Sequence, residues 1–94
     1  MSGWNKWRKL CQAAQQDTAT FDELCQLLMT HEERHQLGQR IEIIENLLAQ
    51  KISQRNISEK LNVSIAKITR GSNELKRAKP KTIKFISQTL DIKS

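Results

Sequence analysis

Apolar residues recur along this chain at the three- and four-residue spacing of helices, and no bounded segment alternates in the manner of a strand. Trp4, Trp7 and Leu10 predict a first helix over residues 4–16. The stretch QQDTATFD (15–22) reads as a break. A short second helix is predicted from Phe21, Leu24, Leu27 and Leu28. A longer third helix, reaching about residue 50, is predicted from the stripe Leu37, Ile41, Ile44, Leu47 and Leu48.

Residues that suit helix ends separate these segments. Thr30 and Glu33 form the T-x-x-E pattern of a capping box, in which each side chain bonds the other residue's amide. Lys79-Pro80 ends one helix and starts the last one, because proline suits the first helical position. That last helix is predicted over residues 80–92 with the apolar stripe Ile83, Ile86 and Leu90.

The segment ISQRNISEKLNVSIAKITRGSNELKR predicts a helix-turn-helix. Ser53 caps a helix at 54–60, Asn62 suits a left-handed turn residue, and Ser64 caps a helix at 65–77. The two helices are expected to cross over the apolar residues Ile57, Leu61, Val63, Ile65 and Ile68. The second helix of such a unit presents its first turn to base edges in the major groove. Candidate DNA-contacting residues are therefore Gln54, Arg55, Ser58, Ile65, Ala66, Lys67, Thr69, Arg70, Ser72 and Lys76.

Composition and charge agree with a small basic DNA-binding protein. Only 37% of the 94 residues are apolar and four are aromatic, so a second copy is expected to complete the core. Residues 1–50 carry five Lys and Arg against seven Asp and Glu, whereas residues 51–94 carry eleven against three. This basic half fits a polyanion partner. We find neither a signal peptide nor an apolar run long enough to span a membrane, and we expect a cytoplasmic protein.

Two features offer other chemistry, and we interpret both as structural. HEERH (31–35) matches the H-E-x-x-H zinc-protease pattern, but no third ligand motif accompanies it and the chain is short for a substrate cleft. Cys11 and Cys25 lie far apart in sequence and are interpreted as small apolar residues in a reducing compartment. We therefore expect neither an enzyme nor a metal site.

Three segments resemble the Trp repressor family: LMTHEERHQLGQRIEIIENLL, SQRNISEKL and ITRGSN, between about residues 27 and 75. The resemblance implies an all-α, six-helix subunit with a helix-turn-helix, forming an intertwined homodimer on palindromic operators of tryptophan-related genes. The whole chain (1–94) would be a single domain, with residues 1–50 mainly the dimerisation core, 53–77 the reading head and 80–92 the C-terminal helix.

The resemblance also implies L-tryptophan as a corepressor ligand. Arg40, Arg70 and Gly71 match the ligand-contacting positions of one subunit, and Leu27, Met29 and Thr30 match those of the partner. Two arginine planes can enclose an indole, and Arg70 offers a fork for its carboxylate. Gly71 would leave room for the ligand. A helix-turn-helix protein that acts without a ligand is the alternative.

Lys67 and Glu74 depart from the family pattern, which commonly has threonine and serine there. Lys67 faces the expected base edges, so it is predicted to alter operator preference. Glu74 follows Arg70 by one helical turn. It could pair with Arg70 and compete with the ligand carboxylate, or it could bind the ligand's ammonium group. We favour the ammonium role and include Glu74 in the ligand site.

Overall fold

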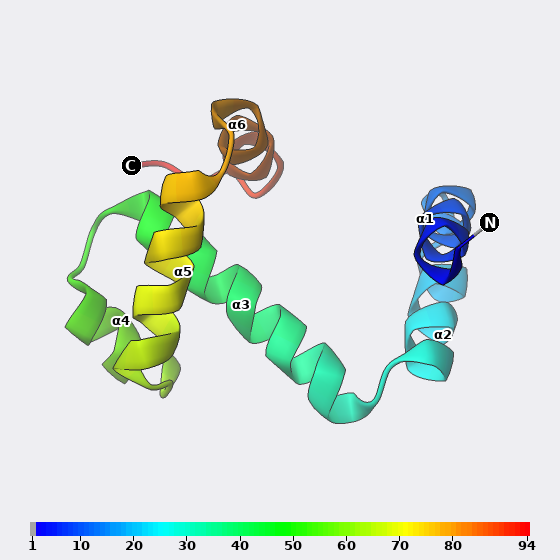
Figure 1. Cartoon of the computed structure of the whole chain (residues 1–94), viewed down its shortest axis with the longest axis horizontal. Helices are drawn as coiled ribbons and strands as arrows, with labels where there is room; N and C mark the ends of the chain where they lie inside the picture. The colour runs from blue at the N-terminus through cyan, green and yellow to red at the C-terminus, as the bar shows by residue number, and fades with distance from the viewer. Residues whose placement is uncertain (1) are drawn as a thin grey trace. The chain divides into compact units, whose positions relative to one another are not determined.

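The computed structural model describes residues 2–94, and within them every regular element is a helix. The six helices shown in Figure 1 are α1 (Gly3–Ala14), α2 (Thr18–Leu28), α3 (His31–Ala49), α4 (Gln54–Leu61), α5 (Ile65–Arg77) and α6 (Pro80–Thr89). The prediction of an all-α, six-helix chain is confirmed.

The described chain forms two compact units, one ending at His35 and the other beginning at Gln36. In the first unit α1 packs against α2, and Ala14 is its buried residue. Helix α2 begins earlier than the sequence pattern indicated. Asp17 is its N-cap and accepts hydrogen bonds from the backbone N–H groups of Ala19 and Thr20, at 3.1 and 3.3 Å. The predicted break at 15–22 is therefore wrong beyond Asp17.

The capping box at the start of α3 is confirmed in both directions. The Thr30 backbone N–H donates to Oε1 of Glu33 at 2.8 Å, and the Glu33 backbone N–H donates to the Thr30 hydroxyl at 3.0 Å. These bonds favour the charged form of Glu33, and the Thr30 backbone N–H contributes most to lowering the pKa of its carboxyl group.

The core of the second unit joins α3, α4 and α5. It is formed by the buried residues Ile43, Ile57 and Ile68, with Leu47, Leu61 and Val63 packed around them. Ile43, which the predicted stripe omitted, is 3% exposed, whereas Leu37 and Ile41 of that stripe are 47% and 46% exposed in the single chain. One prediction about an apolar residue is corrected here. Ile65 was placed over the core, but as the first residue of α5 it is 50% exposed.

Non-glycine residues with left-handed backbone conformations follow three of the helices. Gln50 comes directly after α3 with φ 56°, and Asn62 ends α4 with φ 54°. Asp91, with φ 53°, follows α6, which ends at Thr89 rather than at the predicted residue 92. This turn lets the Ile92 backbone N–H bond the Ser87 carbonyl at 2.8 Å, so the chain leaves the helix there.

Candidate functional site

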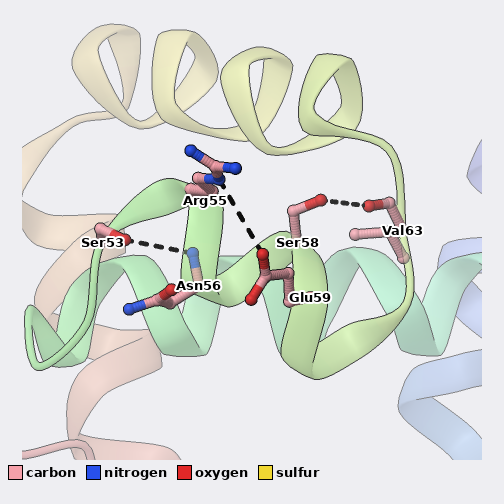
Figure 2. Close-up of polar contacts among 6 residues, drawn as sticks. All are labelled: Ser53, Arg55, Asn56, Ser58, Glu59 and Val63. Atoms are coloured by element: carbon pink, nitrogen blue, oxygen red, sulfur yellow. Dashed lines mark hydrogen bonds and ion pairs between the residues drawn. The ribbon is translucent and has the colours of Figure 1, made fainter.

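Short polar side chains cap both helices of the helix-turn-helix, as predicted. The Ser53 hydroxyl accepts from the Asn56 backbone N–H at 3.1 Å and caps α4. Figure 2 shows this bond together with the one from the Ser58 hydroxyl to the Val63 carbonyl, which closes the turn. The Ser64 hydroxyl caps α5 by accepting from the Lys67 backbone N–H at 3.3 Å. The start of α5 is thus fixed by local bonds on both sides of the turn.

The residues predicted to contact DNA are mostly solvent-exposed on α4 and α5, and only Ser58 and Ser72 are half-buried. Some of their polar groups already have partners. The Arg55 guanidinium lies 3.9 Å from the Glu59 carboxylate, as Figure 2 shows, and the Thr69 hydroxyl donates to the Ile65 carbonyl at 3.0 Å. Ile65 presents an exposed apolar side chain at the tip of α5, which suits contact with a thymine methyl group.

A hollow of about 430 Å³ lies between α3 and α5. Its volume is within the range of sites that hold small ligands. Helix α3 contributes residues one turn apart, and α5 contributes the face that opposes them. The lining residues are Gln36, Gln39, Arg40, Ile43, Ile44, Lys67, Arg70, Gly71 and Glu74. The structure therefore brings together the predicted residues Arg40, Arg70, Gly71 and Glu74.

Gly71 lies where α5 packs tightly against side chains of α3. A Cβ atom at Gly71 would lie 2.9 Å from Cγ2 of Ile43 and 3.4 Å from Cδ1 of Leu47. Real Cβ atoms do not approach other atoms to within 3.0 Å, so a side chain here would push α5 away from α3. Gly71 thus lines the hollow and also permits the packing of α5 against α3. The packing is a second reason for glycine at this position, and sequence interpretation missed it.

Glu74 pairs within its own helix, but not with Arg70. Its Oε1 atom lies 3.2 Å from NH1 of Arg77, three residues along α5, and both side chains are mostly exposed. Among the described residues, the Arg70 side chain has no hydrogen-bond or ion-pair partner. The predicted alternative of an Arg70–Glu74 pair is therefore not formed, and the Arg70 guanidinium is available to an anion.

Lys67, which was predicted to face the base edges of DNA, also lines the hollow. Its ammonium group donates to Oε1 of Gln39 on α3 at 3.2 Å, and both residues line the hollow. Sequence interpretation missed the lining residues Gln36, Gln39, Ile43 and Ile44. Residues 36, 39, 40, 43 and 44 have the spacing of one helical face. Because Arg40 was already a candidate, its neighbours at three- and four-residue spacing could have been predicted to line the same site.

The three residues matched to the partner's side of the ligand site lie in the other compact unit. Leu27 is 81% exposed, which leaves it available to another surface. The Met29 carbonyl accepts from NH1 of Arg34 at 2.7 Å and retains one acceptor position. The Thr30 hydroxyl already accepts the Glu33 N–H, so its own proton remains to be donated.

Two features that the sequence offered for other chemistry lie within residues 2–94. No group of three or more His, Cys, Asp or Glu side chains there could hold a metal ion, so His31 and His35 belong to no such group in this chain. Cys11 and Cys25 are free thiols and half-buried. None of the helices in this part of the chain has the length and apolar character that crossing a membrane requires.

Comparisons with known proteins agree on one family. The family described as "Trp repressor protein" matches residues 2–90. The chain is similar to a Trp operon repressor homolog of Chlamydia caviae, with 40% identity over 90% of this chain and 83% of that protein. It is 39% identical to a Trp operon repressor homolog of Chlamydia trachomatis serovar L2, over 95% of this chain and 94% of the relative. A Haemophilus influenzae homolog, from strain PittEE, is 35% identical over 95% of this chain and 87% of its own length.

Proposed function

Because the chain belongs to the Trp repressor family, we propose that it is a repressor whose binding to palindromic operators of tryptophan-related genes is activated by L-tryptophan. The family is one of DNA-binding transcriptional regulators that are not enzymes, and membership implies operator binding and dimerisation. The proposal adds the identity of the ligand, the kind of operator and the residues that perform each role.

The hollow between α3 and α5 is the observation that carries this proposal. Ile43 and Ile44 give it an apolar lining, and Arg40 and Arg70 add two guanidinium planes from the two helices. A flat indole fits between such planes, because guanidinium groups stack on aromatic faces. Arg70, which has no partner within the described chain, would bind the ligand carboxylate through two parallel hydrogen bonds.

Glu74 would bind the ligand's ammonium group. Its carboxylate lines the hollow and already balances one cation, Arg77, at 3.2 Å. A carboxylate has two oxygens and can accept from a second donor, so the ammonium group would share Glu74 with Arg77. In the dimer, Leu27, Met29 and Thr30 of the partner subunit would complete the site through two carbonyl groups and a hydroxyl.

Ligand and DNA would be coupled because both contact α5. The first turn of this helix, with Ile65, Ala66 and Lys67, would face base edges, and Arg70 lies one turn further along. Phosphates would be bound mainly by Arg55, Ser72 and Lys76, with Gln54, Ser58 and Thr69 as polar neighbours. A ligand in the hollow would stabilise one orientation of α5, and DNA that requires this orientation would bind more tightly.

A DNA-binding titration tests the proposal. A palindromic duplex is first selected by the protein from a randomised pool in the presence of L-tryptophan, and its affinity is then measured with and without the amino acid. We expect L-tryptophan to tighten binding about ten-fold or more, within the usual range of coupling between sites. The Arg70→Ala variant should lose this response, because it lacks both the carboxylate fork and one wall of the hollow.

Calorimetry provides the control. Arg70→Ala should show little tryptophan binding, while Arg77→Ala, which changes the same charge on the same helix outside the hollow lining, should retain it. Unchanged operator affinity on adding tryptophan to the unmodified protein would contradict the proposal. It would support the alternative, a helix-turn-helix regulator without a small ligand.

A further inference from the structure

Lys67 is held by α3 at a position from which a helix-turn-helix reads DNA. It is the third residue of α5, and its backbone N–H is fixed by the Ser64 hydroxyl and carbonyl at 3.3 and 3.1 Å. Its ammonium group, however, donates to Oε1 of Gln39 at 3.2 Å. Only the side chain of Lys67 is therefore free to change partners, and in this structure its partner is Gln39 on the opposite side of the hollow.

The charges around this ammonium group favour an acceptor beside it. The N-terminus of a helix carries partial positive charge, so a cation in its first turn is disfavoured. Arg40 and Arg70 line the same hollow and add two further positive charges, while Glu74 is shared with Arg77. The Gln39 amide oxygen is an acceptor for Lys67 on α3, and the acceptors of guanine or phosphate would replace it on DNA.

We propose that Gln39 is a positioning residue that withholds Lys67 from DNA while the hollow is empty. The two residues line the hollow from opposite helices, so a ligand in it would lie beside their hydrogen bond, and in this proposal it displaces Lys67 from Gln39. Released, Lys67 extends from the first turn of α5 and binds an acceptor on a base edge. Gln39 thereby sets how strongly DNA affinity and base preference depend on the ligand; the ligand-dependent part of this inference rests on the proposed function.

The first test measures operator affinity in the absence of ligand. Gln39→Met removes the amide acceptor but preserves side-chain length and helix propensity. It should tighten ligand-free binding about three-fold, the scale of one weak exposed hydrogen bond. Gln39→Glu replaces the amide with a carboxylate that holds the ammonium group more strongly, and it should weaken ligand-free binding.

The same two substitutions in a Lys67→Met background separate loss of the Lys67–Gln39 hydrogen bond from other effects of changing Gln39. Without the ammonium group, Gln39→Met should have no effect on affinity, and Gln39→Glu should retain only the smaller effect of an added negative charge near DNA. Non-additivity of Gln39 and Lys67 in this double-mutant cycle supports the proposal. Equal effects of Gln39→Met in both backgrounds, or no effect in either, would overturn it.

The chain provides a matched control for loss of a lysine–amide bond. Lys60 of α4 donates to Oδ1 of Asn46 on α3 at 3.1 Å, and neither residue lines the hollow. Asn46→Ala should leave the ligand-free operator affinity unchanged, and a shift equal to that of Gln39→Met would contradict a specific role for the Lys67–Gln39 bond. Thermal unfolding of each variant identifies any loss of folding.

Selection of preferred sites supplies a readout that a merely structural role would not change. Ligand-free Gln39→Met should select the base preferences that the unmodified protein selects with L-tryptophan bound, because Lys67 is released in both. Different base preferences of these two proteins would overturn the proposal that Gln39 withholds Lys67 from DNA. Failure of the unmodified protein to respond to tryptophan would contradict the proposed function instead, since the ligand-free affinities and the double-mutant cycle do not depend on that response.

Discussion

Single side chains on α5 divide between the hollow and the DNA-facing surface. Arg70 keeps its guanidinium free of partners within the described chain, Glu74 shares its carboxylate with Arg77, and Lys67 reaches back to Gln39. These are exposed groups, so the Glu74–Arg77 ion pair and the Lys67–Gln39 hydrogen bond each contribute little to the free energy of folding. Their effect is expected in ligand and DNA affinity, because a partner within the chain competes with the ligand or the DNA for the same charged group.

Glu74→Ser tests the proposed ammonium contact. We expect it to weaken L-tryptophan binding by roughly three- to ten-fold, because a charge-assisted hydrogen bond is lost at a site that Arg77 already partly neutralises. Indole-3-propionate, which lacks the ammonium group, should lose nothing, so the difference between the two ligands narrows. Calorimetry on both ligands measures this, and tighter tryptophan binding by the variant would show that Glu74 repels the carboxylate instead.

Helix ends are the element-scale feature most readily predicted from this sequence. Ser53, Ser64, Thr30 with Glu33, and Asn62 each act within a few residues of their position in the chain, so their roles follow from local geometry. Asp17 obeys the same rule but was missed, because the flanking polar residues suggested a loop. Burial depends less on local sequence. Ile43 and Ile65 have identical side chains, and only the packing of α3, α4 and α5 decides which of them is buried.

The lining of the hollow shows the same division between local and non-local features. Arg40, Arg70 and Gly71 were singled out through a family resemblance and Glu74 as a departure from it, and these four residues line one hollow. Gln39 was not identified, because its partner Lys67 lies 28 residues away and no local pattern connects them. The close contact of Gly71 with Ile43 likewise depends on the packing of two helices.

Gln50→Gly should stabilise the protein by up to about 1 kcal/mol, because glycine adopts positive φ without the steric cost that other residues carry. Gln50 has φ 56° directly after α3. Asn62→Gly is the matched control at φ 54°, and it should change stability less, since asparagine tolerates this conformation. Urea unfolding of both variants measures the difference, and equal effects would contradict this explanation.

The capping box of α3 predicts a loss of stability in acid. Hydrogen bonds from Thr30, its backbone N–H first, lower the pKa of Glu33 in the folded chain. A carboxylate with a lowered folded-state pKa stabilises the fold above its unfolded value, and this contribution disappears as pH falls through the folded value. Glu33→Gln should therefore reduce stability at neutral pH and have a smaller effect near about pH 3.

Urea unfolding at the two pH values tests this, with Glu23→Gln as a variant that makes the same change of charge outside the capping box. A Glu33→Gln effect that persists unchanged in acid would show that the charge of the carboxylate is not what stabilises the helix end.

At the scale of the whole molecule, the single chain leaves large apolar side chains uncovered in both compact units. Trp4 is 68% exposed in the first, and Phe85 is 66% exposed in the second, where Phe85, Ile41 and Leu90 border an apolar groove between α3 and α6. Exposed apolar groups of this size mark surfaces that bind other proteins. Since the family implies dimerisation, we infer that a second copy covers them.

Sedimentation at micromolar concentration should therefore give twice the 10.9 kDa mass of one chain. Trp4→Ser combined with Phe85→Ser should shift the equilibrium toward monomer or destabilise the protein, because both remove apolar area from the interface. A folded, stable monomer of the unmodified chain at this concentration would contradict the shared ligand site as well as the dimer.

Ile43 belongs to the core and also lines the hollow, and this double membership constrains how the protein could evolve. Truncating a buried isoleucine to alanine costs about 2–5 kcal/mol. A small domain has a total stability of about 5–15 kcal/mol, so substitutions of Ile43 that change the ligand site would also remove much of the stability of the fold. Gln39, Arg40 and Glu74 line the same hollow but lie outside the core. Divergence in ligand preference among descendants is therefore expected to accumulate at these three positions, while Ile43 persists.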